Sequence, residues 1–214
     1  MDKLMETTLS ILAGSKITLE IFAATLAMSL PLGLLAALAR LSKIGVISRL
    51  TELYIWIMRG SPLMLQLLFV YFALPLVGIK FDPLPSALLA FILNYAAYFA
   101  EIFRAGIQSI ERGQYEAAKT LGMTYIQTMR RIILPQMIHR VLPPVSNETI
   151  NLVKDTSLIY ILAMNDLLRV ARTIVQRDFD MTAFFIAGVF YLAMTAVLTW
   201  MFKKLEAHYG KYDF

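Results

Sequence analysis

The sequence predicts an all-α integral membrane protein with five transmembrane helices. Of its 214 residues, 58% are hydrophobic and only 16% are charged, and the mean hydropathy is +0.65. A soluble domain of this length carries more charge. The apolar residues form long segments between short polar ones, and a helix of about 20 apolar residues spans a bilayer. We therefore expect residues 1–214 to form a single transmembrane domain.

The five spans are expected at about 17–39, 61–77, 86–104, 143–164 and 181–202. Pro31 lies inside the first span, and membrane helices tolerate proline. The apolar segment 50–58 ends in an arginine and a glycine, which indicates an interfacial elbow rather than a span. Ser61 and Pro62 then suit the N-cap and the first helical position of the second span.

Lysine and arginine counts predict the orientation, because these residues favour the cytoplasmic segments of a membrane protein. With the N-terminus outside and the C-terminus in the cytoplasm, thirteen fall inside: Arg40, Lys43, Arg49, Arg59, Arg104, Arg112, Lys119, Arg130, Arg131, Arg140, Lys203, Lys204 and Lys211. Six fall outside, namely Lys3, Lys16, Lys80, Arg169, Arg172 and Arg177, while Lys154 lies within a span. The three outer arginines belong to a polar connection, residues 165–180, that is expected to carry a short helix.

Several function classes are disfavoured by the residues present. The chain has no cysteine, so it has no disulfide and no thiolate metal ligand. Neither histidine has a partner at metal-ligand spacing, and there is no catalytic triad or GxxxxGK[ST] phosphate-binding loop. The net charge of +5 is better explained by membrane orientation than by nucleic acid. We therefore expect no enzyme and no directly bound cofactor or metal, and the polar start is not expected to be a cleavable signal.

A polar and basic insert, residues 116–135, separates the third and fourth spans within a loop of about 108–140. The run Glu116-Ala117-Ala118 begins a short helical pattern that Gly122 closes. Glycine is common just past a helix C-terminus because it takes the left-handed conformation without strain. The paired alanines leave room for another backbone to approach.

A second helical pattern follows and is expected to stop at Pro135, since proline disfavours helix in the residue before it. Its apolar positions are predicted to share one face: Ile126, Met129, Ile132 and Ile133. Such an element either offers a partner a docking face or is an ordinary interfacial loop helix. The fourth span is expected to begin only after Pro143 and Pro144.

Polar side chains recur near mid-depth in the third and fourth spans, where their burial in hydrocarbon is expensive. At 1.5 Å per residue, Asn94 lies roughly 13 Å below Pro85, and Asn151 roughly 15 Å above Val141. Both depths are near the middle of a core about 30 Å thick. The predicted pathway for a small polar solute consists of Asn94, Tyr98, Asn151, Lys154, Asp155, Thr156, Ser157 and Gln66.

Two interpretations of these polar residues stay open. Lys154 and Asp155 supply a cation and a carboxylate for a zwitterion, or they hold neighbouring helices together. Adjacent residues do not face the same way on a helix, so the two meet different partners. Gln66 equally lines a pathway or bonds between helices. Glu101 and Arg104 are three residues apart and can pair, which favours structural support over solute contact.

The insert also matches a longer pattern: Glu-Ala-Ala, three residues, Gly, nine residues, Ile, one residue, Leu-Pro. It is met at Glu116, Ala117, Ala118, Gly122, Ile132, Leu134 and Pro135. In this the sequence resembles the EAA loop of permease subunits of ABC-type importers. Three further segments resemble the polar amino acid branch of that family: Arg59–Leu63 with Gln66, Tyr98 with Glu101 and Arg104, and Lys154–Ser157. The resemblance covers nearly the whole chain.

The resemblance implies the type I importer permease fold and an ATPase-coupling role for the seven EAA residues. It implies a second permease subunit, identical or different, and two cytoplasmic ABC ATPase subunits that hold ATP and Mg. An extracytoplasmic solute-binding protein would deliver the amino acid, and the complex would sit among the lipids of the bacterial inner membrane. The sequence is similar to subunits for cystine, glutamine or glutamate.

Two alternatives from other classes remain. An ion-driven carrier or channel that works alone would show an internal repeat or a relay of buried acids and histidines, and apart from Asp155 the sequence shows neither. A membrane scaffold would recruit a cytoplasmic protein through the amphipathic loop without transport. In that case the polar residues at mid-depth would be purely structural.

Overall fold

The computed structural model describes residues 2–209, and within that range every regular element is helical. The α-helices are α1 (Asp2–Arg40), α2 (Gly45–Gly60), α3 (Leu63–Leu68), α4 (Pro83–Gln108), α5 (Arg112–Thr120), α6 (Tyr125–Thr128), α7 (Leu134–Asp155), α8 (Leu167–Asp178) and α9 (Thr182–Tyr209). Two π-helical segments, η1 (Phe69–Ala73) and η3 (Met129–Ile133), and two 3₁₀ segments, η2 (Leu74–Val77) and η4 (Thr156–Leu162), continue α3, α6 and α7. Lys211, counted above, lies outside the described residues.

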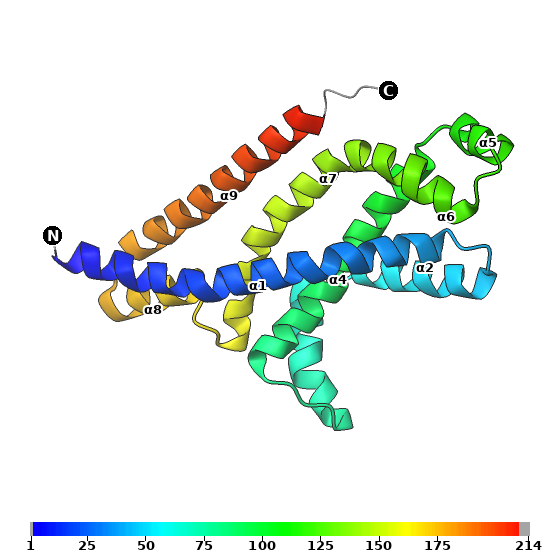
Figure 1. The fold of residues 1–214 in the computed structure, drawn as a ribbon. Coiled ribbons are helices and arrows are strands. Elements are labelled where there is room, and N and C mark those ends of the chain that lie inside the picture. The colour runs from blue at the N-terminus through cyan, green and yellow to red at the C-terminus, as the bar shows by residue number, and fades with distance from the viewer. Residues whose placement is uncertain (1, 210–214) are drawn as a thin grey trace.

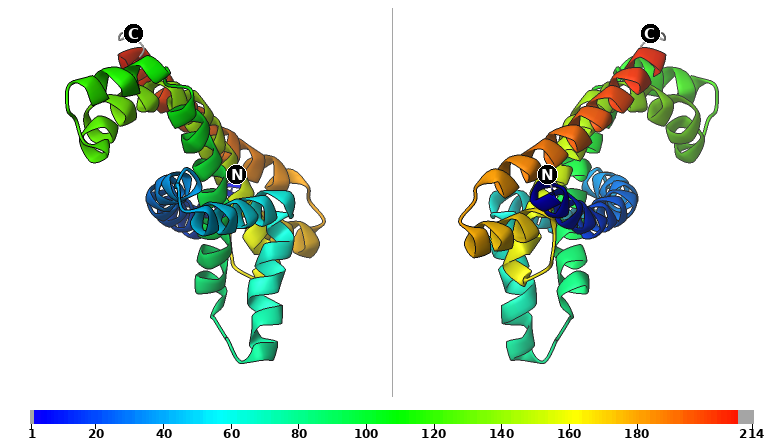
Figure 2. Two further views of the ribbon diagram at one scale, coloured as in Figure 1. Left: turned by 90° about the vertical axis from the view of Figure 1, so that its right-hand side faces the viewer. Right: turned by 90° about the vertical axis from the view of Figure 1, so that its left-hand side faces the viewer.

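The helix α4 forms the centre of the molecule, with α1 on one side and α7 on another (Figure 1). The loop with α5 and α6 projects at one end of the molecule, the end at which α9 also finishes (Figures 1 and 2). The turn between η2 and α4 lies at the opposite end, and α8 lies beside the N-terminal part of α1. The two ends of the molecule are therefore built from different segments.

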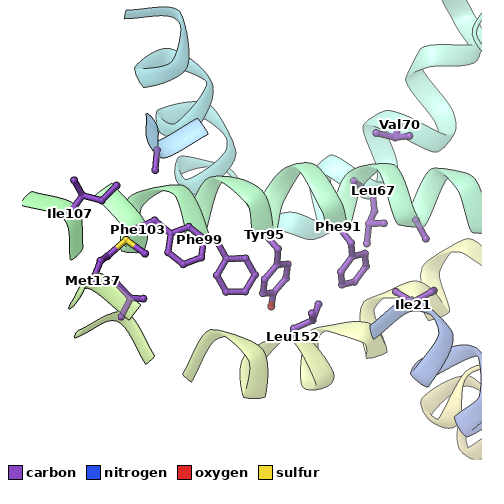
Figure 3. Close-up of a cluster of buried hydrophobic side chains, with 14 of the residues drawn as sticks. Ile21, Leu67, Val70, Phe91, Tyr95, Phe99, Phe103, Ile107, Met137 and Leu152 are labelled. Carbon is purple, nitrogen blue, oxygen red and sulfur yellow. The ribbon is translucent and has the colours of Figure 1, made fainter. Parts of the chain in front are cut away.

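The core is a row of aromatic side chains on α4. Phe91, Tyr95, Phe99 and Phe103 recur at every fourth residue, so they share one face of the helix. Their rings point toward α7, where Leu152 lies opposite (Figure 3). The helix α1 approaches α4 closely at Gly33, where an added Cβ would lie 2.7 Å from the Cβ of Phe99. Large side chains of α4 thus fill the space toward α7, and Gly33 allows α1 to pack closely on α4.

Three helices are long and apolar enough to cross a membrane: α1, α4 and α9. The helix α2 and the segment 63–77 are apolar enough only as a pair, and their axes differ by 105°. They count as a fourth candidate if the pair is one broken span. The helix α7 is not among these candidates, since its polar residues lower its mean hydropathy. The number of five spans therefore stays a prediction.

Three expected helix boundaries are wrong. The first helix begins at Asp2 rather than near residue 17, because residues 2–16 pack on α8. Ile11 is fully buried, and a Cβ added at Gly14 would lie 2.9 Å from the Asp166 backbone. Further on, the chain stays helical from 125 to 162 and does not stop at Pro135. In η3 the Leu134 N–H donates to the Met129 carbonyl, five residues back. This wider turn accommodates the proline that would interrupt a regular α-helix.

Pro143 and Pro144 also lie inside α7 rather than before its start. Membrane helices tolerate such prolines because neighbouring helices and side chains satisfy the freed backbone groups. The short helix expected in the connection 165–180 is confirmed as α8. Asp166 caps it, accepting bonds from the backbone N–H groups of Leu168 at 3.2 Å and Arg169 at 3.0 Å. Burial raises the pKa of the Asp166 carboxyl, although these bonds counteract the shift.

Replacing Gly106 by alanine is expected to destabilise the packing of α4 on α7. The added Cβ would lie 2.2 Å from Cγ1 of Val141 and 2.9 Å from Cγ of Met137. Overpacking of this kind costs about 1–3 kcal/mol, so the melting temperature of the protein in mild detergent should fall.

The control is Gly188→Ala on α9, where a Cβ meets nothing within 4 Å. Adding Val141→Ala to Gly106→Ala should recover part of the lost stability. Equal melting temperatures for Gly106→Ala and Gly188→Ala would contradict the close crossing at Gly106.

Candidate functional site

A polar cavity lies where the chain bends between α2 and α3. Its volume is about 580 Å³, and α2, α3, α4 and α7 contribute to its wall. The lining residues are Arg59, Gly60, Ser61, Pro62, Leu63, Met64, Asn94, Tyr95, Tyr98, Glu148, Asn151, Asp155 and Leu158. Non-helical backbone at membrane depth is tolerated where it is buried in protein or lines a cavity. The break between α2 and α3 meets that condition.

Two amide side chains satisfy the backbone at this break. The Gln66 Nε2 donates to the Met58 carbonyl at 2.9 Å and to the Ser61 Oγ at 2.9 Å. The Asn94 Nδ2 donates to the same Met58 carbonyl at 3.0 Å and to the Gln66 Oε1 at 3.0 Å. Pro62 has no N–H, so the last carbonyls of α2 need donors from elsewhere. Gln66 and Asn94 provide them and tie α4 to the break.

Charged groups of both signs face the cavity. The Tyr95 hydroxyl donates to the Asp155 Oδ2 at 2.7 Å, which fixes that carboxylate against α4. The Arg59 guanidinium lies 5.3 Å from the centre of the Tyr98 ring. Among the described side chains, no carboxylate lies within ion-pair distance of Arg59. With Glu148, the wall therefore carries one guanidinium and two carboxylates.

The predicted pathway residues fall into two groups. Asn94, Tyr98, Asn151 and Asp155 line the cavity together. The other four lie elsewhere. Gln66 forms hydrogen bonds at the helix break, and Lys154 is exposed. Thr156 is buried and its hydroxyl donates to the Val153 carbonyl at 2.7 Å, while Ser157 is half-buried outside the cavity. Lys154 and Asp155 thus face different surroundings, as adjacent helical residues do.

The predicted pathway did not include Arg59, Tyr95 or Glu148, although Glu148 continues the polar stripe of the fourth span and all three line the cavity. A signal was present for Arg59, a lone charge between an apolar segment and Gly60-Ser61-Pro62. Glu148 lies one helical turn before Asn151, which places both on one face of α7. Nothing in the sequence shows that the Tyr95 hydroxyl reaches Asp155 on another helix.

Two further cavities continue from Arg59 toward the end of the molecule that carries α5 and α6. One shares Arg59, Tyr98 and Glu148 with the first cavity and extends to Ser109 and Arg140. The other shares Arg59 with it and reaches the Glu101–Arg104 pair. In that pair the Arg104 Nε donates to the Glu101 Oε2 at 3.0 Å, as the three-residue spacing predicts. Three cavities that share Arg59 therefore adjoin one another and lead away from the helix break.

The segment between α4 and α7 carries five of the seven EAA residues, and the other two, Leu134 and Pro135, begin α7. The helix α5 ends in a left-handed glycine, Gly122, with φ of 71°. The Gly122 N–H donates to the Lys119 carbonyl at 3.0 Å, and the Met123 N–H to the Ala118 carbonyl at 3.0 Å. This is the Schellman arrangement expected for such a glycine. Thr124 and Gln127 then form a capping box that starts α6.

The surface of this loop is apolar at its tip. Leu121, Tyr125 and Ile126 are 78%, 66% and 75% exposed. Among the EAA residues, Glu116, Ala117, Gly122 and Pro135 are exposed, Ile132 and Leu134 are half-buried, and Ala118 is buried. Of the four residues predicted to share one face, Met129 and Ile133 are buried, Ile132 is half-buried and Ile126 is exposed.

Comparisons with known proteins agree on one family. Residues 29–211 match the family described as the binding-protein-dependent transport system inner membrane component. The chain is 42% identical over 182 residues to the probable amino-acid ABC transporter permease protein YckA of Bacillus subtilis, covering 85% of this chain and 80% of the relative. It is 36% identical over 199 residues to the glutamine transport system permease protein GlnP of Escherichia coli, covering 92% of this chain and 91% of the relative. It is 38% identical over 183 residues to the L-cystine transport system permease protein TcyB of Bacillus subtilis, covering 85% of this chain and 78% of the relative.

Solved structures agree with this assignment. A crystal structure of an amino acid ABC transporter with histidines contains a chain that is 32% identical, with a TM-score of 0.89 over 96% of this chain and 97% of that one. The inward-facing MetNI methionine ABC transporter gives a TM-score of 0.73 at 18% identity over 96% and 95%, which shows the shared fold alone.

These findings define an all-helical inner-membrane component of a binding-protein-dependent transport system, and the chain belongs to that family. It is a permease subunit of an ABC transporter, in the amino acid branch that its motifs indicate. It is a multi-pass protein of the bacterial inner membrane and not itself an enzyme, since ATP hydrolysis belongs to a partner subunit.

Replacing Gln66 by leucine is expected to lower the stability of the folded protein. The change removes the amide that donates to the Met58 and Ser61 carbonyls, and it removes the oxygen that accepts from the Asn94 side chain. A buried polar group left without its partner costs about 1–3 kcal/mol. Thermal unfolding in mild detergent measures this loss.

The same substitution at the exposed Gln176 of α8 serves as the control and should leave the melting temperature unchanged. A Gln66→Leu protein as stable as the Gln176→Leu protein would refute the role of Gln66 at the helix break.

Proposed function

We propose that the chain is the transmembrane subunit of an ATP-driven importer and that the cavity at the helix break contacts a polar amino acid during transport. The observation that carries this proposal is the wall itself, in which groups of both charges and an amide face one space. A zwitterion requires a cation for its carboxylate and a carboxylate for its ammonium group. Polar groups at this depth are otherwise expensive.

The proposed roles follow from the geometry of the wall. Arg59 forms no ion pair with any described carboxylate, so its guanidinium receives the carboxylate of the solute. Glu148 receives the ammonium group, because Asp155 is already held by Tyr95. Asn151 and Tyr98 offer hydrogen bonds to the remainder. Asn94 is committed to the helix break and shapes the wall from there.

The charge of the wall bears on the substrate. Two carboxylates against one guanidinium favour a solute without net negative charge. Of the three amino acids that the sequence resemblance suggests, glutamine and cystine fit this condition better than glutamate. Relatives of the chain are named for glutamine and cystine transport.

The EAA loop is proposed to couple this pathway to the ATPase. Its exposed surface combines Glu116 and Ala117 with the apolar residues Leu121, Tyr125 and Ile126, which suits a protein partner. ATP and Mg are held by two ABC ATPase subunits, and this chain holds no cofactor. Closure of the ATPase dimer moves the loop and shifts the pathway between outward-open and inward-open states, through differential affinity for the two states.

The rest of the assembly follows from the family. Two permease subunits, identical or different, enclose the pathway, and a solute-binding protein delivers the amino acid from outside. The N-terminus lies outside and the C-terminus in the cytoplasm, so the EAA loop faces the ATPase. The lysine and arginine distribution supports this orientation.

Changing Gly122 to aspartate is expected to abolish uptake while the subunit stays in the membrane. A β-carbon at a φ of 71° strains the turn and displaces the apolar tip. Glu116→Lys is expected to act in the same way. The measurements are uptake of labelled glutamine and recovery of an ABC ATPase with the purified subunit.

Gly45→Asp introduces the same side chain at the first residue of α2, where a Cβ meets nothing within 4 Å, and should leave uptake intact. Normal uptake by both EAA variants would rule out coupling through this loop. Uptake without any ATPase would instead support a carrier that works alone.

Changing Glu148 to glutamine is expected to raise the KM for uptake at least about tenfold, because the solute ammonium loses a charged hydrogen-bond acceptor worth about 1.5–3 kcal/mol. Glu20→Gln removes a carboxylate at an exposed position of α1 and should not change the KM. Competition by excess glutamine but not glutamate would support the substrate class. An unchanged KM in Glu148→Gln with unchanged protein level would remove Glu148 from the pathway.

A further inference from the structure

The outward face of α8 carries two arginines that the transport pathway does not use. Leu167, Ala171 and Ile174 are buried against α1 and α9, together with their neighbours. At 100° per residue, Arg169 and Arg172 lie on the opposite side of the helix. The apolar face of α8 is thus filled by protein, and its basic face is left toward the surroundings.

These arginines have no acidic partner among the described residues. The ion pairs at this end use other groups: Lys3 lies 3.4 Å from Asp178, and Arg177 lies 2.7 Å from it. Both neighbours hold the pKa of Asp178 down, at about 2, so its charge is already engaged. The contacts of the two arginines are neutral. The Arg169 Nε donates to the Asn165 Oδ1 at 3.2 Å, and the Arg172 guanidinium lies 5.7 Å from the centre of the Tyr160 ring.

The position of this pair is also informative. The helix α8 lies away from α5 and α6, near the N-terminal part of α1 (Figures 1 and 2). In the proposed orientation it lies outside, where arginines are disfavoured by the distribution rule. The Arg169 guanidinium also donates to the Tyr160 carbonyl at 3.4 Å. Tyr160 belongs to η4, and Leu158 of the same segment lines the polar cavity.

We propose that Arg169 and Arg172 form a docking site for an acidic surface of the solute-binding protein. The inference rests on the proposed function, which requires such a protein on this side of the membrane. Charge complementarity supports this occupant, because two adjacent guanidinium groups without described carboxylates match acidic side chains. A lipid surface fits less well, since a helix that lies on a membrane inserts its apolar face, and that face is occupied here.

The test uses the permease with its ATPase in nanodiscs, which leave both faces accessible. ATP hydrolysis is measured while the solute-binding protein that supports uptake in wild-type cells is titrated. The double variant Arg169→Glu with Arg172→Glu should raise the half-saturating concentration at least about tenfold, because like charges across an interface are strongly unfavourable. The rate at saturation should stay unchanged. Added salt should raise the half-saturating concentration of the wild type more than that of the variant.

Two controls accompany the double glutamate variant. Lys80→Glu reverses an exposed charge on the turn before α4, at a distance from α8, and should leave the titration unchanged. Arg169→Gln with Arg172→Gln should shift the titration in the same direction but less, and it avoids new carboxylates beside the buried Asp166. This neutral pair keeps the test valid where the charge reversal disturbs folding.

The outcomes are distinguishable. If the binding protein stimulates all forms at the same concentration, the docking site is refuted and the importer remains. If it never stimulates the wild type, the proposed function itself fails. If omission of phosphatidylglycerol lowers the activity of the wild type but not of the glutamate pair, with equal titrations, the arginines bind a lipid headgroup and the docking proposal is overturned.

Discussion

The break between α2 and α3 is the constraint on which the rest of the structure depends. A helix that ends among apolar side chains leaves carbonyl groups that need donors, and Pro62 cannot supply one. Gln66 and Asn94 supply them from two other helices. Only because these bonds are made can the chain turn by 105° at Gly60-Ser61-Pro62 and open a polar space there. The same residues that stabilise the fold therefore create the site.

The helix α4 divides its residues between these two tasks. Asn94 is bonded to the break, whereas Tyr95, the next residue, lies in the aromatic row and holds Asp155 on α7. The row packs against α7, and Gly106 lets the two helices approach further along. Because Tyr95 belongs both to the core and to the cavity wall, the position of Asp155 depends on core packing. Local changes in the core are expected to be felt in the pathway.

The sequence predicted what depends on composition and on local patterns. The helical class, the left-handed Gly122, the Glu101–Arg104 pair and the short helix α8 all follow from residues close together in the chain. The features that the sequence could not predict depend on contacts between residues far apart in the chain. The helix through Pro135 is stabilised by its neighbours and by a π turn, which proline propensity does not include.

The site was predicted only in part for the same reason. Depth along a helix placed Asn94, Tyr98, Asn151 and Asp155 at one level, and these residues share the cavity. Depth does not give direction around the helix axis, however, so Lys154 and Thr156 were included although they face elsewhere. Arg59 was missed because the bend that turns it into the cavity depends on donors from Gln66 and Asn94, not on its own surroundings.

The helical path from 125 to 162 connects the three functional regions. It begins within the EAA loop, contributes Glu148, Asn151 and Asp155 to the cavity, and ends at η4, where Tyr160 contacts both arginines of α8. Its middle is α-helical, whereas η3 at one end is π-helical and η4 at the other is 3₁₀. Such segments within a helix often mark functional hinges, since their hydrogen bonding differs from the regular pattern. Because both cavity carboxylates lie on α7, a change in the tilt of this helix would move them together relative to Arg59 on α2. Such a displacement would alter the affinity of the cavity for a zwitterion.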